Sequence, residues 1–160
     1  MAVRGFCYLI LTMATAILAG CGGGIMLKAP LAPTQAIVKV RTSGKLPADA
    51  AIGAIKAAIT YPATKGLSIT ANSVVPSGSG AGAGTFLVPN VNKPGQVVFI
   101  LANIAPGIQS GEFATLTFSI AAGNSPTAGD FAIASGASIL DTNSTAIPGL
   151  TVEIQDVAFQ

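Results

Sequence analysis

The chain has 160 residues, of which 51% are hydrophobic and only 9% charged, and its eight basic and six acidic residues give a formal net charge of +2. It contains no histidine, so the composition argues against zinc, copper and haem sites and removes the usual general base and the histidine of a catalytic triad. Low charge with high apolar content is typical of a folded domain rather than a disordered one, and no basic run is dense enough to predict a nucleic-acid partner.

Residues 1–20 have the form of a secretory signal peptide. Arg4 precedes an apolar run over residues 6–18, which is too short for a membrane-spanning helix, and small residues follow it. Leu18-Ala19-Gly20-Cys21 resembles the lipobox of bacterial lipoproteins, in which the cysteine thiol receives a diacylglycerol and becomes the mature N-terminus. The resemblance implies Cys21 as the lipid attachment site, with fatty acids such as palmitate; the alternative is an uncleaved membrane anchor.

The lipobox resemblance also implies a location in the bacterial cell envelope. Gly22 stands where an aspartate is associated with inner-membrane retention, which favours the outer membrane in a Gram-negative host. Cys7 would leave with the signal and Cys21 would carry lipid, so no disulfide is expected within one mature chain. Residues 21–34, with three consecutive glycines and two prolines, are expected to form a lipidated tether.

The folded domain is expected over residues 35–160, and its pattern is that of an all-β protein. Apolar residues alternate with others over residues 36–41, as in a half-buried strand, whereas residues 50–61 fit either a helical stripe or a strand. The run at residues 96–104 is nearly all apolar, which is typical of a central strand buried on both faces. Further strands are predicted at residues 66–75, 85–88, 112–120, 131–133, 138–140 and 150–155. Eight to ten short strands with frequent turn signals predict a two-sheet antiparallel β-sandwich.

The order of these elements resembles cohesin domains and the wider carbohydrate-binding-module-like superfamily. The resemblance rests on Val38 and Val40, on residues 52–62, on the segment Gly107-Ile-Gln-Ser-Gly-Glu-Phe-Ala-Thr-Leu-Thr-Phe118, and on Leu140-Asp141-Thr142-Asn143. It covers residues 36–157 and implies a jelly roll of about nine strands, with a strand at residues 52–61. It also implies protein binding, because cohesins use one sheet face to bind dockerin modules. Outward positions here are mostly Ala, Ser and Thr, so no partner-contact residue is carried over.

Three groups of residues are candidate sites. The glycine-rich segment at residues 78–84 lacks the following helix that a phosphate cradle needs, and is expected to be a flexible loop. Asp141 and Asn143 have a spacing seen in calcium loops. Calcium needs six to eight oxygen ligands, which this segment does not supply, and an Asx turn explains the two residues without a metal. Glu112 and Glu153 are expected to be surface carboxylates. We therefore predict no catalytic, cofactor-binding or metal-binding residue and no cofactor.

Basic residues gather between Lys28 and Lys93, whereas five of the six acids follow Pro94, and we expect strands from the two halves to interleave and neutralise one another. The leading hypothesis is a non-catalytic, lipid-anchored cell-envelope protein whose domain mediates protein–protein binding or surface assembly, through a strand face or through edge-strand addition. The alternative is a carbohydrate-binding module with a polysaccharide partner. Carbohydrate-binding surfaces usually stack sugars on aromatic rings, and this chain has no tryptophan and, after the signal, only Tyr61 as a tyrosine. The phenylalanines are mostly expected in the core, which also weighs against the alternative.

Overall fold

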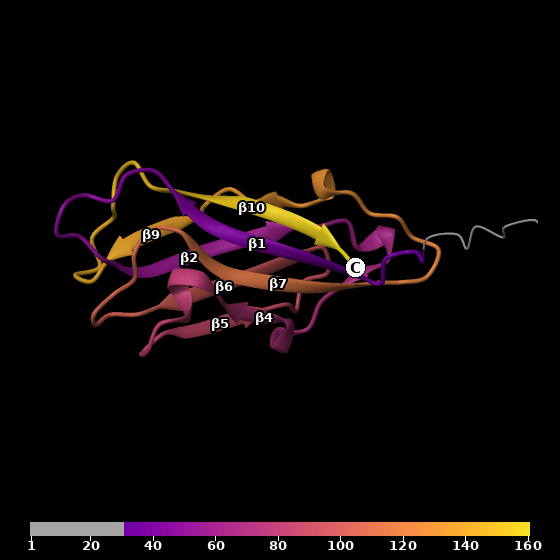
Figure 1. The fold of residues 1–160 in the computed structure, drawn as a ribbon, viewed down its shortest axis with the longest axis horizontal. Coiled ribbons are helices and arrows are strands. Elements are labelled where there is room, and N and C mark those ends of the chain that lie inside the picture. The colour runs from indigo at the N-terminus through magenta and orange to yellow at the C-terminus, as the bar shows by residue number, and fades with distance from the viewer. Residues whose placement is uncertain (1–30) are drawn as a thin grey trace, which may run out of the picture. The chain divides into compact units, whose positions relative to one another are not determined.

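The computed structural model describes residues 31–160, which fold into ten β-strands and four short 3-10 helices (Figure 1). The expected signal peptide, Cys21 and most of the expected tether lie outside the described residues. None of the helices in residues 31–160 is long and apolar enough to cross a membrane. The strands are β1 (Gln35–Ser43), β2 (Ile52–Thr60), β3 (Leu67–Ser68), β4 (Val74–Pro76), β5 (Phe86–Asn90), β6 (Gln96–Ala102), β7 (Glu112–Ile120), β8 (Ala132–Ile133), β9 (Ser138–Asp141) and β10 (Thr151–Phe159).

The strands form two antiparallel sheets of five strands each. In one, here called the β1 sheet, the order is β10-β1-β7-β3, and β4 also pairs with β7. In the other, here called the β2 sheet, the order is β5-β6-β2-β8, and β9 also pairs with β2. Figure 1 shows β10, β1 and β7 side by side, with β9, β2, β6 and β5 in the other layer. The prediction of an all-β, two-sheet sandwich is confirmed.

One hydrophobic core lies between the two sheets. Alternate residues of β1 and β7 point into it, and Ala36, Val38 and Val40 have no exposed surface, as their alternation predicts. Phe99 of β6 meets Phe113 of β7 across the layers, with ring centroids 6.1 Å apart. Contacts of this kind join the sheets without a disulfide.

The ambiguous segment at residues 50–61 is a strand. In β2, buried Ile55, Ala57 and Ile59 alternate with more exposed residues, which is the period of a strand and not of a helix. The register shifts at Gly53, where a methyl group would lie 2.5 Å from the carbonyl oxygen of Asp141. The strand implied by the cohesin resemblance is therefore correct, and the helical alternative is wrong.

The prediction of one strand over residues 66–75 is wrong. A 3-10 helix (Ala71–Ser73) separates β3 from β4, and both short strands pair with β7, Leu67 opposite Ile120 and Val74 opposite Leu116. The hydroxyls of Thr70 and Ser73 lie 2.9 Å apart across this helical turn. Such local side-chain contacts compete with a continuous ladder.

The prediction of a flexible loop at residues 78–84 is wrong for residues 78–81. A 3-10 helix (Gly78–Ala81) lies against β7, and Gly80 is buried there. A methyl group at Gly80 would lie 2.3 Å from the carbonyl oxygen of Phe113, and Ser79 Oγ donates a 2.8 Å hydrogen bond to the carbonyl of Glu112. The glycines here allow close packing of one backbone on another rather than looseness.

Candidate functional site

The outer face of the β2 sheet exposes large apolar side chains. Phe86 and Val88 of β5 are 72% and 66% exposed, and Ile100 of β6 is 46% exposed. Ile104, two residues beyond the end of β6, is 71% exposed. Four of the six large hydrophobic side chains exposed in residues 31–160 thus belong to one strand pair and its extension. Clusters of exposed apolar side chains are typical of interaction surfaces.

The strand register places these side chains in rows across the sheet. Phe86 lies opposite Ala102, which lies opposite Ala54, and Ala54 lies opposite Leu140 of β9, so the first row is entirely apolar. In the next row, Val88 lies opposite Ile100 and Ile100 opposite Lys56.

We call the surface formed by Phe86, Val88, Ile100, Ala102, Ala54, Leu140 and Lys56 the apolar face. Lys56 is the only charged residue in β2, β5 and β6. Its side chain is exposed, and it belongs to none of the ion pairs formed within residues 31–160. The apolar face therefore presents one unpaired positive charge within a hydrophobic surface.

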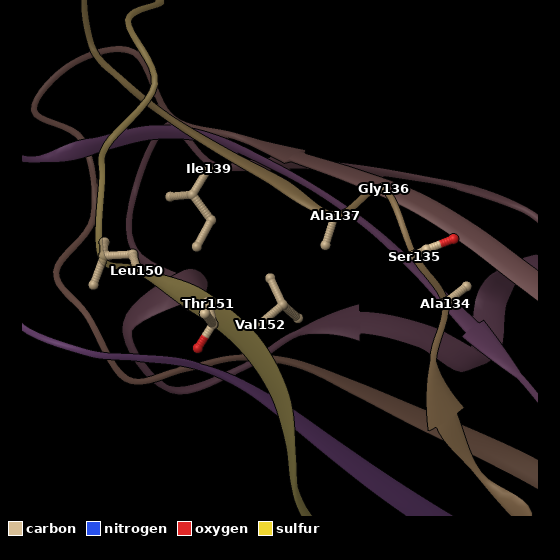
Figure 2. Close-up of a pocket in the computed structure, with 8 residues that line it drawn as sticks. All are labelled: Ala134, Ser135, Gly136, Ala137, Ile139, Leu150, Thr151 and Val152. Carbon is tan, nitrogen blue, oxygen red and sulfur yellow. The ribbon is translucent and has the colours of Figure 1, made fainter.

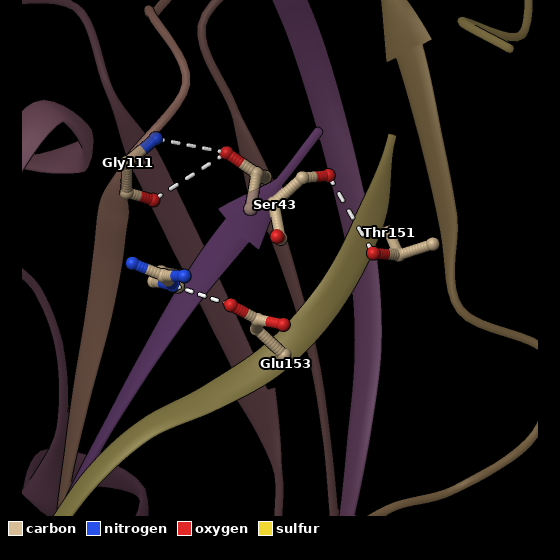
Figure 3. Close-up of polar contacts among 6 residues, drawn as sticks. Ser43, Gly111, Thr151 and Glu153 are labelled. Atoms are coloured by element: carbon tan, nitrogen blue, oxygen red, sulfur yellow. Dashed lines mark hydrogen bonds and ion pairs between the residues drawn. The ribbon is translucent and has the colours of Figure 1, made fainter. Parts of the chain in front are cut away.

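The outer face of the β1 sheet is of the opposite character. Lys39 Nζ lies 3.3 Å from Glu112 Oε2. Arg41 Nε pairs with Glu153 Oε1, and Figure 3 shows this second pair at Glu153. These pairs join the basic first half of the chain to the acidic second half across neighbouring strands, as predicted from the uneven charge distribution. These two pairs neutralise four of the charges on this face within the domain, whereas Asp156 of β10 belongs to none of the ion pairs found in residues 31–160.

The surroundings of Glu112 favour its ionised form. A hydrogen bond from Ser77, together with the ammonium of Lys39, lowers the pKa of Glu112 despite some desolvation. A general acid needs the opposite shift. The carboxylate is a paired surface group, as expected.

Two buried polar side chains anchor the loops around the sheets. Thr42 Oγ1 accepts a 2.9 Å hydrogen bond from the backbone N–H of Gly111, which fixes the start of β7 beside the end of β1 (Figure 3). Asn103 Nδ2 donates to Ala83 O and Thr85 Oγ1, and its Oδ1 accepts from the N–H of Gly107. Asn103 therefore holds the segments that enter β5 and leave β6, next to Phe86 and Ile104.

The other sequence-derived candidates are not brought into one site. Asp141 Oδ1 accepts hydrogen bonds from the backbone N–H groups of Asn143 and Thr145, both at 2.8 Å, so the Asx turn is confirmed. Within residues 31–160 no cluster of three potential metal ligands occurs. Tyr61 is buried against Phe118, with ring centroids 4.9 Å apart, and offers no stacking platform.

The apolar face is the feature that sequence reasoning missed. The apolar run at residues 96–104 is predicted to be buried on both faces, but of its apolar residues only Val97, Phe99 and Leu101 are buried, and Ile100 is 46% exposed. The phenylalanines were expected in the core, and Phe86 is the clear exception. The sequence does hold one signal for the apolar face. In β5, Phe86 and Val88 share one side of the strand and Leu87 lies on the other, and Pro89 marks β5 as an edge strand.

Comparison with known proteins identifies the fold. No family model matches the chain, and no curated protein is similar enough in sequence to count as a relative. Among solved structures, the sixth cohesin of scaffoldin B from Acetivibrio cellulolyticus, crystallised with a dockerin mutant, matches with a TM-score of 0.55 and 21% identity over 72% of this chain and 82% of that one. A non-cellulosomal cohesin from the archaeon Archaeoglobus fulgidus matches with a TM-score of 0.50 and 16% identity over 72% and 75%. The described domain has a cohesin-like fold.

Proposed function

We propose that this chain is a non-catalytic, lipid-anchored cell-envelope protein whose cohesin-like domain binds a partner protein through the apolar face. The observation that carries the proposal is the contrast between the two outer faces: the β1 sheet carries the ion pairs Lys39–Glu112 and Arg41–Glu153, whereas the β2 sheet leaves Phe86, Val88 and Ile100 exposed. Covering such side chains gives association free energy in proportion to the apolar area removed from water. The cohesin of Acetivibrio cellulolyticus in complex with a dockerin shows that this fold can serve binding.

The chemistry of the apolar face defines the partner that it fits. An apolar partner surface would cover the rows of Phe86 and Val88, and a carboxylate in that surface would meet the ammonium of Lys56. Charge complementarity of this kind directs orientation and suppresses wrong partners, while the hydrophobic contacts supply most of the affinity.

Ile100 and Val75 provide a matched pair for testing the binding face. Both are β-branched residues with nearly equal exposure, 46% and 45%, but Ile100 lies on the β2 sheet and Val75 lies in β4 of the β1 sheet. The full-length protein and the variants Ile100→Gln and Val75→Gln would be crosslinked in the intact envelope and the captured proteins quantified by mass spectrometry. We expect a specific partner whose recovery falls about tenfold with Ile100→Gln and is unchanged with Val75→Gln. Equal recovery with the three proteins would remove the apolar face from the proposal.

The lipid anchor is supported by the sequence Leu18-Ala19-Gly20-Cys21. Metabolic labelling with palmitate tests it directly. We expect label on the wild-type protein, and we expect the Cys21→Ser variant to lose both the label and the cleaved, membrane-bound form. A labelled Cys21→Ser protein, or an unlabelled wild type, would contradict the assignment. Separation of inner and outer membranes then tests the outer-membrane location that Gly22 favours.

Carbohydrate binding is the alternative that the same face allows, because the exposed ring of Phe86 is flat and accessible. Sugar platforms use aromatic rings, and with Tyr61 buried this one would depend on Phe86. A glycan array separates the two functions. Specific binding to a polysaccharide that is lost in Phe86→Ser would favour the carbohydrate module over the protein-binding one.

A further inference from the structure

The two lateral edges of the sandwich are closed in different ways. At one edge lie β4 and β5, and each contains a proline, Pro76 and Pro89. Proline has no backbone N–H and prevents the addition of another strand to an edge. The other edge is formed by β10 of the β1 sheet and by β8 and β9 of the β2 sheet (Figure 1).

At this second edge the short strand β9 is covered and β10 is not. The following segment pairs along β9, with the N–H of Ile147 donating to Ile139 O and the N–H of Asp141 donating to Thr145 O. β10 is nine residues long, contains no proline or lysine, and pairs with β1 on one side alone. Within residues 31–160 it is the one long edge strand that neither contains a proline nor is covered by a neighbouring segment, although it has a register shift at Gln155.

The backbone of β10 presents free hydrogen-bonding groups along this edge. The N–H of Gln160 donates to Gln35 O, so by the alternation of an antiparallel ladder the N–H and C=O groups of Val157 point away from β1. On the other side of the register shift at Gln155, the same alternation turns the groups of Val152 and Ile154 outward. An added strand would pair with these groups.

A pocket of about 290 Å³ opens beside the start of β10. Figure 2 shows Ile139, Leu150, Val152 and Ala137 pointing into the space between β10 and the segment before β9. A cavity of roughly 150 Å³ already accommodates benzene when its lining is apolar, so this pocket has room for a large hydrophobic side chain.

The charges on β10 determine which strand could pair with it. Asp156 is exposed and forms no ion pair among those found in residues 31–160, and Glu153 lies on the same outer face. On its paired side, β10 lies beside β1, which places Lys39 opposite Asp156 and Arg41 opposite Glu153. The β1 residues that alternate with these basic residues are apolar. Opposite charges across neighbouring strands are favourable, and like charges are not.

The same charges disfavour a second copy of this chain as the occupant. When two β10 strands pair antiparallel with Val152 of one copy opposite Val157 of the other, Glu153 of one copy lies opposite Asp156 of the other, twice over. A different, basic sequence has no such repulsion and also supplies a partner for the exposed carboxylate of Asp156.

We infer that β10 is a second binding site, which accepts by strand addition an extended segment of another protein in which apolar residues alternate with lysine or arginine. One large apolar side chain of that segment enters the pocket at Ala137 and Val152, and its basic residues meet Glu153 and Asp156. Strand addition of this kind obtains affinity from main-chain hydrogen bonds and specificity from side-chain pockets. The site is separate from the apolar face and does not depend on it.

A peptide probe tests this inference. The probe is a fluorescently labelled, terminally blocked peptide with the sequence of residues 35–43, because this sequence already has the apolar and basic alternation that β10 accepts. With the full-length protein in detergent we expect saturable binding, together with slower hydrogen exchange of the amides of residues 151–159. A matched peptide carrying Lys39→Glu and Arg41→Glu should bind about tenfold more weakly.

Substitution of the pocket provides the second arm. Ala137 is exposed, so Ala137→Phe fills the pocket without a cost to the core, and Ala137→Ser is its control; thermal unfolding checks that both fold. We expect Ala137→Phe to weaken peptide binding about tenfold and Ala137→Ser to leave it unchanged. Absence of binding, exchange protection elsewhere than β10, or equal binding by Ala137→Phe would overturn the inference. Sedimentation showing a dimer that Ala137→Phe abolishes would assign the edge to a second copy instead. The Ile100→Gln variant should bind the peptide normally, which separates this site from the apolar face.

Discussion

Val88 and Ile100 lie directly opposite one another on the outer face of the β5–β6 pair, and both are exposed. A cross-strand pair of β-branched residues stabilises a sheet by a few tenths of a kcal/mol to about 1 kcal/mol. That gain does not require these residues to be as apolar as they are, because polar β-branched residues serve equally well on a solvated face. Their hydrophobicity is better explained by contact with a partner than by the stability of the domain.

Val88→Thr is expected to leave the free energy of unfolding within about 0.5 kcal/mol of wild type, because the side chain is 66% exposed and threonine keeps its shape. The matched control is Val97→Thr in β6, where the side chain is fully buried and the new hydroxyl would cost about 1–3 kcal/mol. Urea unfolding of the two variants measures the difference. A large loss of stability in Val88→Thr would mean that the apolar face is needed for folding rather than for binding.

Much of the sandwich could be predicted from the sequence, because burial on one side of a sheet produces a period of two. β1 and β7 show it plainly, and the inward set Ala114, Leu116 and Phe118 was predicted correctly. The break between β3 and β4 was not predictable in this way, since it depends on the hydrogen bonding of a short helical turn and on the shared partner β7.

The apolar face was hidden from sequence reasoning for a physical reason. A strand that is apolar on both faces is normally buried on both, so the run in β6 indicates a covered strand and not an uncovered one. Only the strand register shows that Ile100 lies at the surface between Val88 and Lys56. This placement identifies the outer side of β6 as a candidate binding surface and not as part of a second hydrophobic core. The free edge of β10 could not be predicted either, because the local sequence of a strand does not show which strands pair with it.

Thr42→Val tests the anchoring of β7. The substitution removes the buried hydroxyl that accepts the N–H of Gly111 and leaves that partly buried donor without a side-chain partner, which should cost about 1 kcal/mol or more. Thr117→Val on the outer face of β7 is the control, and its expected effect is within about 0.5 kcal/mol. Chemical denaturation measures both. Equal stability of the two variants would show that Thr42 contributes only its shape.

Gly80→Ala tests whether the segment at residues 78–81 is packed. The new methyl group would lie 2.3 Å from the carbonyl oxygen of Phe113, so the helical turn must move away from β7, and we expect a loss of about 1–3 kcal/mol. Gly82 in the same loop has an ordinary φ of −65° and a nearest atom 3.9 Å from the added methyl group. Gly82→Ala should therefore be neutral or stabilising by up to about 1 kcal/mol, through a less flexible unfolded chain. If the two variants unfold alike, the loop does not pack on β7 in solution.

Acid stability should depend on Glu112. Its pKa is lowered below the ordinary value of 4.5, first by the hydrogen bond from Ser77 and then, against a desolvation that raises it, by Lys39. A carboxylate with a lowered pKa in the folded state adds stability above its unfolded pKa, and this stability is lost as the pH falls from about 4.5 through the folded value. Glu112→Gln lacks the ionised group, so its stability should fall less steeply over that range and approach the wild type at lower pH.

Lys39→Gln separates the two causes of the lowered pKa. Because the hydrogen bond from Ser77 is the largest single cause and does not involve Lys39, this variant should retain part of the acid dependence that Glu112→Gln loses. Unfolding in urea at a series of pH values measures all three proteins, and the difference between them cancels contributions from other acids such as Asp130, whose pKa is lowered chiefly by a hydrogen bond from Lys65. If Lys39→Gln flattens the profile as fully as Glu112→Gln does, the ion pair and not the serine hydroxyl stabilises the carboxylate.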